Sequence, residues 1–266
     1  MAKAKKEEAV PLPYLEGDGD EQLQGLYGQW YACSKCPLHV ERPGPDVVFG
    51  EGKAKARILL VGEAPGEEEE RTGIPFHGPS GQLLNQMLAL VSDDLEVQEI
   101  SKWYDKAART KENVRRFHEV VAEWRKKEFF ITNVVCCRPP ENRQPTNPEI
   151  KSCSERLRAI INIVDPLVII SIGKTALEAL VHRVTEITQK RGQLHEIEVM
   201  GRVMPVKYPV MPILHPSYLL RKADWKVKDG DYAKTVKDLY KAMRLKDELM
   251  LHNFGTPIPE RVDPTR

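Results

Sequence analysis

Four of the five cysteines are spaced in a way that could hold a metal centre. Cys33 and Cys36 form a C-x-x-C pair near the N-terminus, and Cys137 and Cys153 follow far downstream with fifteen residues between them. Sets of four thiolates bind either zinc or a 4Fe–4S cluster. Zinc ribbons usually use two C-x-x-C knuckles, so the wide second pair favours a cluster. We interpret the fifth cysteine, Cys136, as a small buried side chain.

A second candidate site is the stretch from Val61 to Leu84, which reads VGEAPGEEEERTGIPFHGPSGQLL. The apolar run just before it, at 56–61, predicts a buried parallel strand. The stretch therefore forms a long loop at the carboxyl end of a strand, where open α/β sheets bind their ligands. Its repeated glycines and prolines, its four consecutive glutamates and its single aromatic, Phe76, indicate a functional site more than a simple connection.

Three single residues could contact a ligand. His215 follows the apolar run 210–214 and precedes a Pro-Ser turn and basic residues. A lone histidine is more often structural, but this position at a strand's carboxyl end favours function. Asn133 lies inside an apolar strand, where an amide is costly unless it is hydrogen-bonded. It either ties a neighbouring loop or reads the edge of a ligand. Phe76 either packs in the hydrophobic core or provides an aromatic face on which a ligand stacks.

The elements that must position these residues alternate between strand and helix. Short apolar runs predict strands at residues 56–61, 129–135, 167–172 and 210–214. Helices are predicted at residues 21–32, 83–88, 149–164, 174–181 and 232–251. Residues 184–207 alternate enough to indicate edge β structure. This order predicts one α/β domain over residues 21–252, with a flexible tail at 1–20 and a loose C-terminal tail at 253–266.

Residues 92–128 interrupt the α/β order with a segment of high helix propensity. From Lys102 to Lys127 it holds nine Lys or Arg against four acids. Four aromatic residues are interleaved with these charges: Trp103, Tyr104, Phe117 and Trp124. We predict a helical insertion. It either covers the core as a solvated helix pair or faces a nucleic acid.

Composition excludes several classes of function. The chain has 266 residues and a formal net charge of +1, so bulk charge neither suggests nor excludes a nucleic-acid partner. The sequence contains no run of eighteen apolar residues, so it predicts no membrane span. The start of the chain lacks the apolar region of a secretory signal. We therefore expect a cytoplasmic protein. An odd number of cysteines argues against a disulfide framework.

The motif Gly173-Lys174-Thr175 follows the third predicted strand and is similar to the end of a phosphate-binding P-loop. Position 168 is Val where that motif requires Gly, so we reject a nucleoside triphosphatase.

Several motifs in a fixed order resemble the family 4 uracil-DNA glycosylases. They are CxxCPLHxxR…VVFGEG, GEAPGEEEERTGIPF followed by GQLL, NVVCCRPPENR with Cys153 downstream, and HPSYLLR. The resemblance covers about residues 23–91 and 129–240. It implies a three-layer α/β/α sandwich with a central four-stranded parallel sheet and a 4Fe–4S cluster. It also implies an enzyme that removes uracil from single- or double-stranded DNA by hydrolysing the N-glycosidic bond.

The resemblance also implies roles for individual residues. Cys33, Cys36, Cys137 and Cys153 would hold the cluster, which would be structural. Glu63 and the backbone of Ala64 would lie beside the sugar and the attacking water, and Glu69 would supply a wall of the base pocket. Phe76 would stack on the flipped base, Asn133 would pair with its edge, and His215 would donate to uracil O2. Ser217, Tyr218, Leu219 and Arg221 would lie on the DNA, with Leu219 as a wedge in the base stack.

Two other functions remain open at this stage. One is a non-catalytic Fe–S protein of the same fold that binds nucleic acid. The other is a superfamily glycosylase with a different damaged-base specificity, such as hypoxanthine. We expect uracil-containing DNA as the partner of a monomer.

Overall fold

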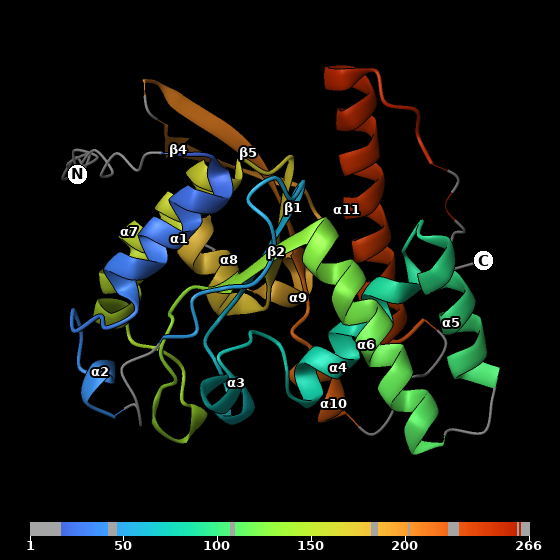
Figure 1. Cartoon of the computed structure of the whole chain (residues 1–266), viewed down its shortest axis with the longest axis horizontal. Helices are drawn as coiled ribbons and strands as arrows, with labels where there is room; N and C mark the ends of the chain where they lie inside the picture. Colours follow the sequence, from blue (N-terminus) through green and yellow to red (C-terminus); the bar gives the residue numbers. More distant parts are fainter. Residues whose placement is uncertain are drawn as a thin grey trace.

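A mostly parallel β-sheet forms the centre of the molecule (Figure 1). The computed structural model describes residues 17–41, 47–106, 110–181, 186–201, 203–222, 229–259 and 261, and for residues 41 and 102–106 it describes the backbone alone. The strands are β1 (Ile58–Gly62), β2 (Phe129–Asn133), β3 (Val168–Ile172), β4 (His195–Met200) and β5 (Pro205–Ile213), in the order β2-β1-β3-β5-β4.

The four predicted parallel strands are confirmed, and a fifth strand is added at one edge. β1, β2, β3 and β5 pair in parallel, whereas β4 pairs with β5 in an antiparallel hairpin. β5 begins at Pro205, earlier than the predicted strand, and its first half has β4 as its only sheet neighbour among the described residues. This hairpin accounts for the edge β structure that the alternating pattern indicated, except at residues 187–190, which form a short helix.

Helices cover both faces of the sheet, which confirms the predicted three-layer architecture (Figure 1). One face packs against α1 (Gly19–Trp30), α7 (Asn147–Val164) and α8 (Lys174–Leu180). The other packs against α4 (Pro79–Leu90), α5 (Leu95–Lys106), α6 (Lys111–Glu128) and α11 (Asp231–Phe254). The remaining helices are short: α2 (Leu38–Glu41), α3 (Glu67–Thr72), α9 (Ile187–Lys190), α10 (Pro216–Leu220) and the 3₁₀ turn η1 (Pro140–Asn142).

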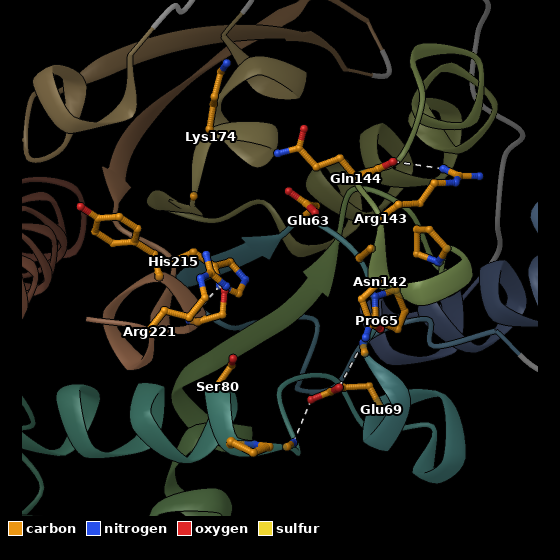
Figure 2. A pocket seen from close by; sticks show the side chains of 18 of the residues that line it. Glu63, Pro65, Glu69, Ser80, Asn142, Arg143, Gln144, Lys174, His215 and Arg221 are labelled. Atoms are coloured by element: carbon orange, nitrogen blue, oxygen red, sulfur yellow. Dashed lines mark hydrogen bonds between the residues drawn. The ribbon is translucent and has the colours of Figure 1, made fainter. Parts of the chain in front are cut away.

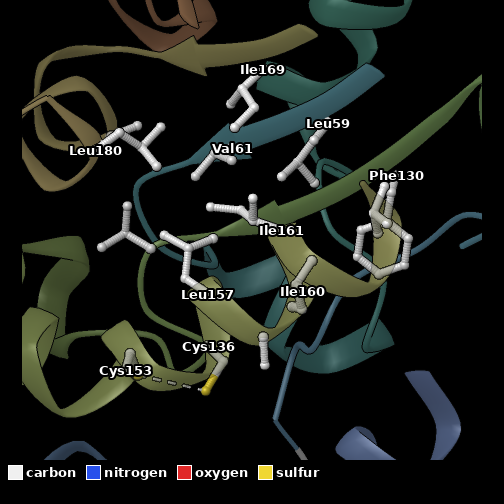
Figure 3. Close-up of a cluster of buried hydrophobic side chains, with 14 of the residues drawn as sticks. Leu59, Val61, Phe130, Cys136, Cys153, Leu157, Ile160, Ile161, Ile169 and Leu180 are labelled. Carbon is white, nitrogen blue, oxygen red and sulfur yellow. Dashed lines mark hydrogen bonds between the residues drawn. The ribbon is translucent and has the colours of Figure 1, made fainter. Parts of the chain in front are cut away.

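The strands are apolar almost throughout because both faces of the sheet are buried. Leu59 and Val61 of β1 point into the cluster beneath α7, together with Ile169 of β3 (Figure 3). Ile58 and Leu60 point into the cluster on the opposite face. All five residues are at most 1% exposed, so the period-2 alternation of a strand fills both cores at once.

The insertion at 92–128 folds into α5 and α6, as its helix propensity predicted. α6 buries Phe117, Val121 and Trp124 against the core, in agreement with a helix pair that covers the sheet. The side chains of Trp103 and Tyr104 lie outside the described residues.

The two predicted tails have different outcomes. Residues 1–16 lie outside the described residues, and Asp18 caps α1 by accepting hydrogen bonds from the amides of Asp20 and Glu21. The loose C-terminal tail is wrong at one position. Arg261 is 8% exposed and its guanidinium pairs with Asp247 of α11, because a buried charge needs such partners.

Candidate functional site

A cleft of about 770 Å³ lies at the carboxyl edge of the parallel strands (Figure 2). Its walls come from the segments that follow β1, β2, β3 and β5. β1 lies between β2 and β3 in the sheet, so the chain crosses to opposite sides at this point. Open α/β sheets bind ligands at such switch points. The sequence-predicted residues in the lining are Glu63, Ala64, Glu69, His215, Ser217, Tyr218 and Arg221.

The glutamate-rich loop after β1 contains a short helix, α3. The sequence analysis did not predict this helix, because the glycines and prolines around it indicated a loop. The four glutamates occupy its first turn, where negative charge is favourable at a helix N-terminus. Glu69 is 9% exposed and folds the loop back on itself. One carboxylate oxygen accepts from the amides of His77 and Gly78 at 2.9 and 2.8 Å, and the other accepts from Gly66 at 3.1 Å. Glu69 therefore shapes the wall of the cleft as well as lining it.

Glu63 is positioned by a residue that the sequence analysis did not select. The side chain of Glu63 lies in the cleft just beyond β1, and the Thr175 hydroxyl donates to its carboxylate. Thr175 is 7% exposed and lies in the first turn of α8. The available signal was the Gly-Lys-Thr motif after β3, which marks a strand-to-helix turn at the cleft.

His215 lies at the N-cap of α10 and is held in one orientation. Its Nδ1 accepts from the backbone amide of Ser217 at 3.1 Å and lies 2.8 Å from the Ser217 hydroxyl. Burial and, to a smaller extent, the nearby charge of Arg221 lower the pKa of His215 to about 4. The imidazole is therefore neutral near pH 7, and with Nδ1 as the acceptor, Nε2 carries the proton. This geometry provides a neutral N–H donor in the cleft wall.

Asn133 and Phe76 lie beneath the cleft rather than in its lining. Asn133 is 2% exposed and Phe76 is 7% exposed. Both crowd Gly62, since a Cβ added there would be 2.3 Å from Asn133 Oδ1 and 2.7 Å from Phe76 Cζ. The Phe76 ring centroid is 6.1 Å from that of His215. The structure thus brings together the amide, the aromatic ring and the imidazole that the sequence singled out separately.

The Asn133 side chain is incompletely satisfied. Its Oδ1 is buried and has no hydrogen-bond partner among the residues the structure describes. The backbone of Asn133 is fixed from the other side, because the buried Arg156 of α7 donates to its carbonyl at 2.5 Å. A buried acceptor without a partner costs roughly 1–3 kcal/mol, which a ligand N–H could recover.

Leu219 is the one predicted DNA-contact residue that the structure contradicts. It is 0% exposed and packs in the core beneath α10, so it does not reach the surface as a wedge. The reason is helical phase: Pro216 and Leu219 form the inner face of α10, and Leu220, 41% exposed, points outward. Ser217, Tyr218 and Arg221 do line the cleft.

The cysteines converge on one region of the molecule. Cys137 and Cys153 are buried in the cluster beneath α7, and Cys33 and Cys36 pack against the same cluster from the N-terminal loop. Burial raises the pKa of both Cys33 and Cys36, and the charges of Cys137 and Cys153 raise both further. The donor set fits a thiolate-bound metal centre, although no group of three or more possible ligands is gathered for a metal ion in the described part of the chain.

Cys136 lies close to one of the candidate metal ligands, although it was predicted only as a small buried side chain. It is 1% exposed, as expected for a small buried side chain. Its Sγ lies 3.9 Å from Sγ of Cys153. Figure 3 shows the two side chains pointing toward each other. The hydrogen bond from Cys136 and the charge of Arg156 help to lower the pKa of Cys153 to about 6. The geometry therefore makes Cys136 an alternative to Cys137 as a candidate metal ligand.

Residues after β2 and β3 complete the cleft. Asn142, Arg143 and Gln144 follow β2, and Lys174 follows β3 (Figure 2). Arg143 pairs with Glu149 at 2.7 Å and thereby lowers the pKa of that carboxyl to about 2. The three residues after β2 were not selected from the sequence, because surface polar residues in a proline-rich loop carry no periodic signal, and Lys174 was considered only as part of a P-loop-like motif.

Comparison with known proteins agrees with this architecture. A family model described as the uracil DNA glycosylase superfamily matches residues 49–239. The type-4 uracil-DNA glycosylase of Thermotoga maritima is 38% identical over 190 residues, which is 71% of this chain and 78% of the relative. That of Pyrobaculum aerophilum is 34% identical over 75% of this chain and 85% of its own. That of Archaeoglobus fulgidus is 31% identical over 75% and 84%.

The fold and the cleft define an α/β protein with a ligand site at the carboxyl edge of a parallel sheet. The sequence matches make this more specific, and the chain belongs to the uracil DNA glycosylase superfamily. The described helices include none that is long and apolar enough to cross a membrane.

Proposed function

We propose that this protein excises uracil from DNA by hydrolysing the N-glycosidic bond and leaves an abasic site. Its relatives over most of the chain are named as uracil-DNA glycosylases, which supports the reaction class. The target carbon is unreachable inside a duplex, so the base must be flipped out and held. A cleft of about 770 Å³ is large enough for a nucleotide with part of its backbone.

The observation that carries the proposal is the partnerless Oδ1 of Asn133 beside the Phe76 ring. In our proposal the uracil stacks on Phe76, its N3–H donates to Asn133 Oδ1, and its O4 accepts from the Asn133 amide nitrogen. Cytosine presents the opposite pattern at both positions, so it would leave the amide unsatisfied. Selection of uracil over cytosine then follows from one side chain held rigid by β2.

His215 is proposed to stabilise the leaving base. Cleavage of a glycosidic bond passes through an oxocarbenium-like state while negative charge develops on uracil. A neutral imidazole whose Nε2 carries a proton donates to O2 more strongly as that charge grows, which favours the transition state selectively. The Ser217 amide fixes the required tautomer.

Glu63 is proposed to orient the attacking water. Its carboxylate lies in the cleft beside Ala64, and the bond from Thr175 limits its rotation. One oxygen is used by Thr175, and the other is available to a water. Glu69 would complete the wall around the base, and Ser217, Tyr218 and Arg221 would face the DNA strand.

We further propose that Cys33, Cys36, Cys137 and Cys153 hold a 4Fe–4S cluster. Bound there, the cluster would supply structural cross-linking and no electron to the hydrolysis. It would join the N-terminal loop to the exit of β2 and to the first turns of α7. The exit of β2 contributes residues to the cleft, so the cluster would stiffen the cleft from one side. We also propose that the protein acts as a monomer.

The test is release of free uracil from a labelled single-stranded oligonucleotide with one uracil, using anaerobically purified protein in the presence of a chelator. We expect uracil release and a strand that breaks at the abasic site in alkali. Matched oligonucleotides with cytosine, thymine or hypoxanthine at the same position should stay intact. Tight binding without base release would favour the non-catalytic alternative. Preferential release of hypoxanthine would favour the other specificity.

A further inference from the structure

A buried arginine connects the helical insertion to the loop that carries Phe76. Arg125 lies near the C-terminal end of α6 and is 3% exposed. Its guanidinium donates to Glu51 Oε2 and to Asn85 Oδ1, both at 2.9 Å. It also donates to the carbonyls of Phe76 at 3.3 Å and Pro75 at 3.4 Å. A charge this deeply buried is expected only where its partners are fixed.

The backbone that Arg125 holds is strained. Phe76 has a φ of 53°, in the left-handed region that a bulky residue rarely adopts. Such a conformation costs on the order of 1–3 kcal/mol and persists only where the surroundings enforce it. The two carbonyl contacts of Arg125 fall on Phe76 itself and on the residue before it. The arginine therefore acts directly on the strained turn.

Two further elements close on the same turn. Gly81, in the first turns of α4, allows the helix to approach so closely that an added Cβ would be 1.7 Å from the Phe76 carbonyl oxygen. Asn85, one turn further along α4, is 6% exposed and binds Arg125. α4 and α6 thus both contact the backbone of Phe76, and the absence of a side chain at Gly62 leaves room for the Phe76 ring.

We propose that Arg125 is a positioning residue for the Phe76 platform, and that the insertion helix α6 thereby sets the geometry of base stacking. This inference rests on the proposed function, since it assigns Phe76 the role of contacting the base. The guanidinium holds the turn in the conformation that presents the ring beside Asn133 and His215. Without it the turn relaxes toward an ordinary φ and the ring moves out of register with the base.

The experiment compares single-turnover uracil excision at saturating DNA for Arg125→Met, Arg125→Lys and the wild type. A displacement of about 1 Å at a reacting group costs roughly 100-fold in rate, so we expect Arg125→Met to be slower by about 10- to 100-fold. DNA affinity should change only a few-fold. Arg125→Lys keeps the charge but lacks the planar fork, so it should recover part of the rate.

Arg261→Met is the matched control, because Arg261 is also a buried arginine that ties a loop to helices. Its partners Val91, Asp93 and Asp247 do not line the cleft. It should lower the melting temperature without slowing excision in the folded protein. A second comparison places Arg125→Met in a Phe76→Ala background. If Arg125 acts through Phe76, its removal there should add less than about a threefold loss, because coupled residues are not additive.

Three results would overturn the inference. The first is a wild-type rate in folded Arg125→Met. The second is an equal loss from Arg125→Met with and without Phe76. The third is an equal loss of rate in Arg261→Met. Absence of uracil release by the wild type would instead overturn the proposed function and this inference with it, so the two failures are distinguishable.

Discussion

The cleft and the cysteine region show two different ways of building a site. In the cleft, the main side chains are already fixed by bonds within the chain: Glu69 by three amides, His215 by Ser217 and Glu63 by Thr175. In the cysteine region, burial raises the pKa of Cys33 and Cys36 and so favours their neutral thiol forms. The first site is organised by the fold alone, whereas we propose that a metal centre organises the second.

This difference predicts the largest effect for loss of a cluster ligand. Cys137→Ser should abolish the brown colour and the iron and sulfide content, and the protein should become unstable, because binding energy at such a site is also folding energy. The measurement is iron and acid-labile sulfide in anaerobically purified protein, with about four of each expected in the wild type.

Cys136→Ser is the matched control, since Cys136 lies next to Cys137 and its Sγ is 3.9 Å from that of Cys153. It should keep colour and iron. A colourless Cys136→Ser with a brown Cys137→Ser would exchange the two assignments. Stoichiometric zinc without sulfide in the wild type would remove the cluster altogether.

The next largest effect is expected in the cleft at His215. One preorganised donor to a developing anion is worth roughly 3–4 kcal/mol, so His215→Ala should slow single-turnover cleavage by about a hundredfold or more. The cluster should be retained and the melting temperature at pH 7 should change little, because the contacts of His215 are with Ser217 and Phe76 and not with the cysteine region. Equal losses in rate and in DNA affinity would mean that His215 positions the DNA instead.

Asn133→Ala tests the reading of the base. Loss of both hydrogen bonds to the uracil edge should slow excision by about tenfold to a hundredfold at saturating DNA, with each buried bond worth about 1 kcal/mol or more. Asn133→Asp should weaken uracil excision and admit cytosine when the carboxyl is protonated. Wild-type rates in Asn133→Ala, measured on the same uracil oligonucleotide, would leave Asn133 a purely structural residue.

A smaller effect is expected where a residue only supports another. Thr175→Val removes the bond to Glu63 but keeps the shape of the side chain, and should lower the cleavage rate several-fold. Thr175→Ser keeps the hydroxyl and should restore most of it. The check is the Glu63→Gln background, in which Thr175→Val should have little further effect. A full additional loss there would separate Thr175 from Glu63.

The smallest effect concerns pH. Because the pKa of His215 is about 4 in the folded protein, its neutral form persists at neutral and mildly acidic pH. The cleavage rate should therefore show no titration of His215 between about pH 5.5 and 8, whereas an ordinary histidine titrates near 6.5. A rate that changes tenfold across pH 6.5 in the wild type, but not in His215→Ala, would contradict this.

The pKa of His215 also predicts how the stability of the folded protein changes with pH. The unfolded histidine has a pKa of about 6.5, so between about pH 6.5 and 4 the unfolded state binds more protons than the folded state. The contribution of neutral His215 to stability is therefore complete above about pH 6.5 and is lost as the pH falls. The difference in melting temperature between wild type and His215→Ala, measured across this range, separates the contribution of His215 from the contributions of the buried carboxyl groups.

The sequence by itself determined the order of the main strands and helices along the chain and placed the ligand site at the carboxyl ends of the parallel strands. The apolar runs could only be strands buried on both faces, and their carboxyl ends place the following loops together. Residue type was sufficient to select His215, Asn133 and Phe76 as candidates, because each is unusual for its local segment. The spacing of the cysteines was likewise a property of the chain alone.

Only the tertiary structure decided how these residues are held. The buried position of Leu219 depends on the phase of α10 against the core, which a helix of five residues does not encode. The partners of Arg125 and Arg261 are far away in the chain, so no local pattern predicts that either arginine is buried. The bond from Thr175 to Glu63 and the strained turn at Phe76 arise for the same reason: each is imposed by an element brought close only when the sheet is complete.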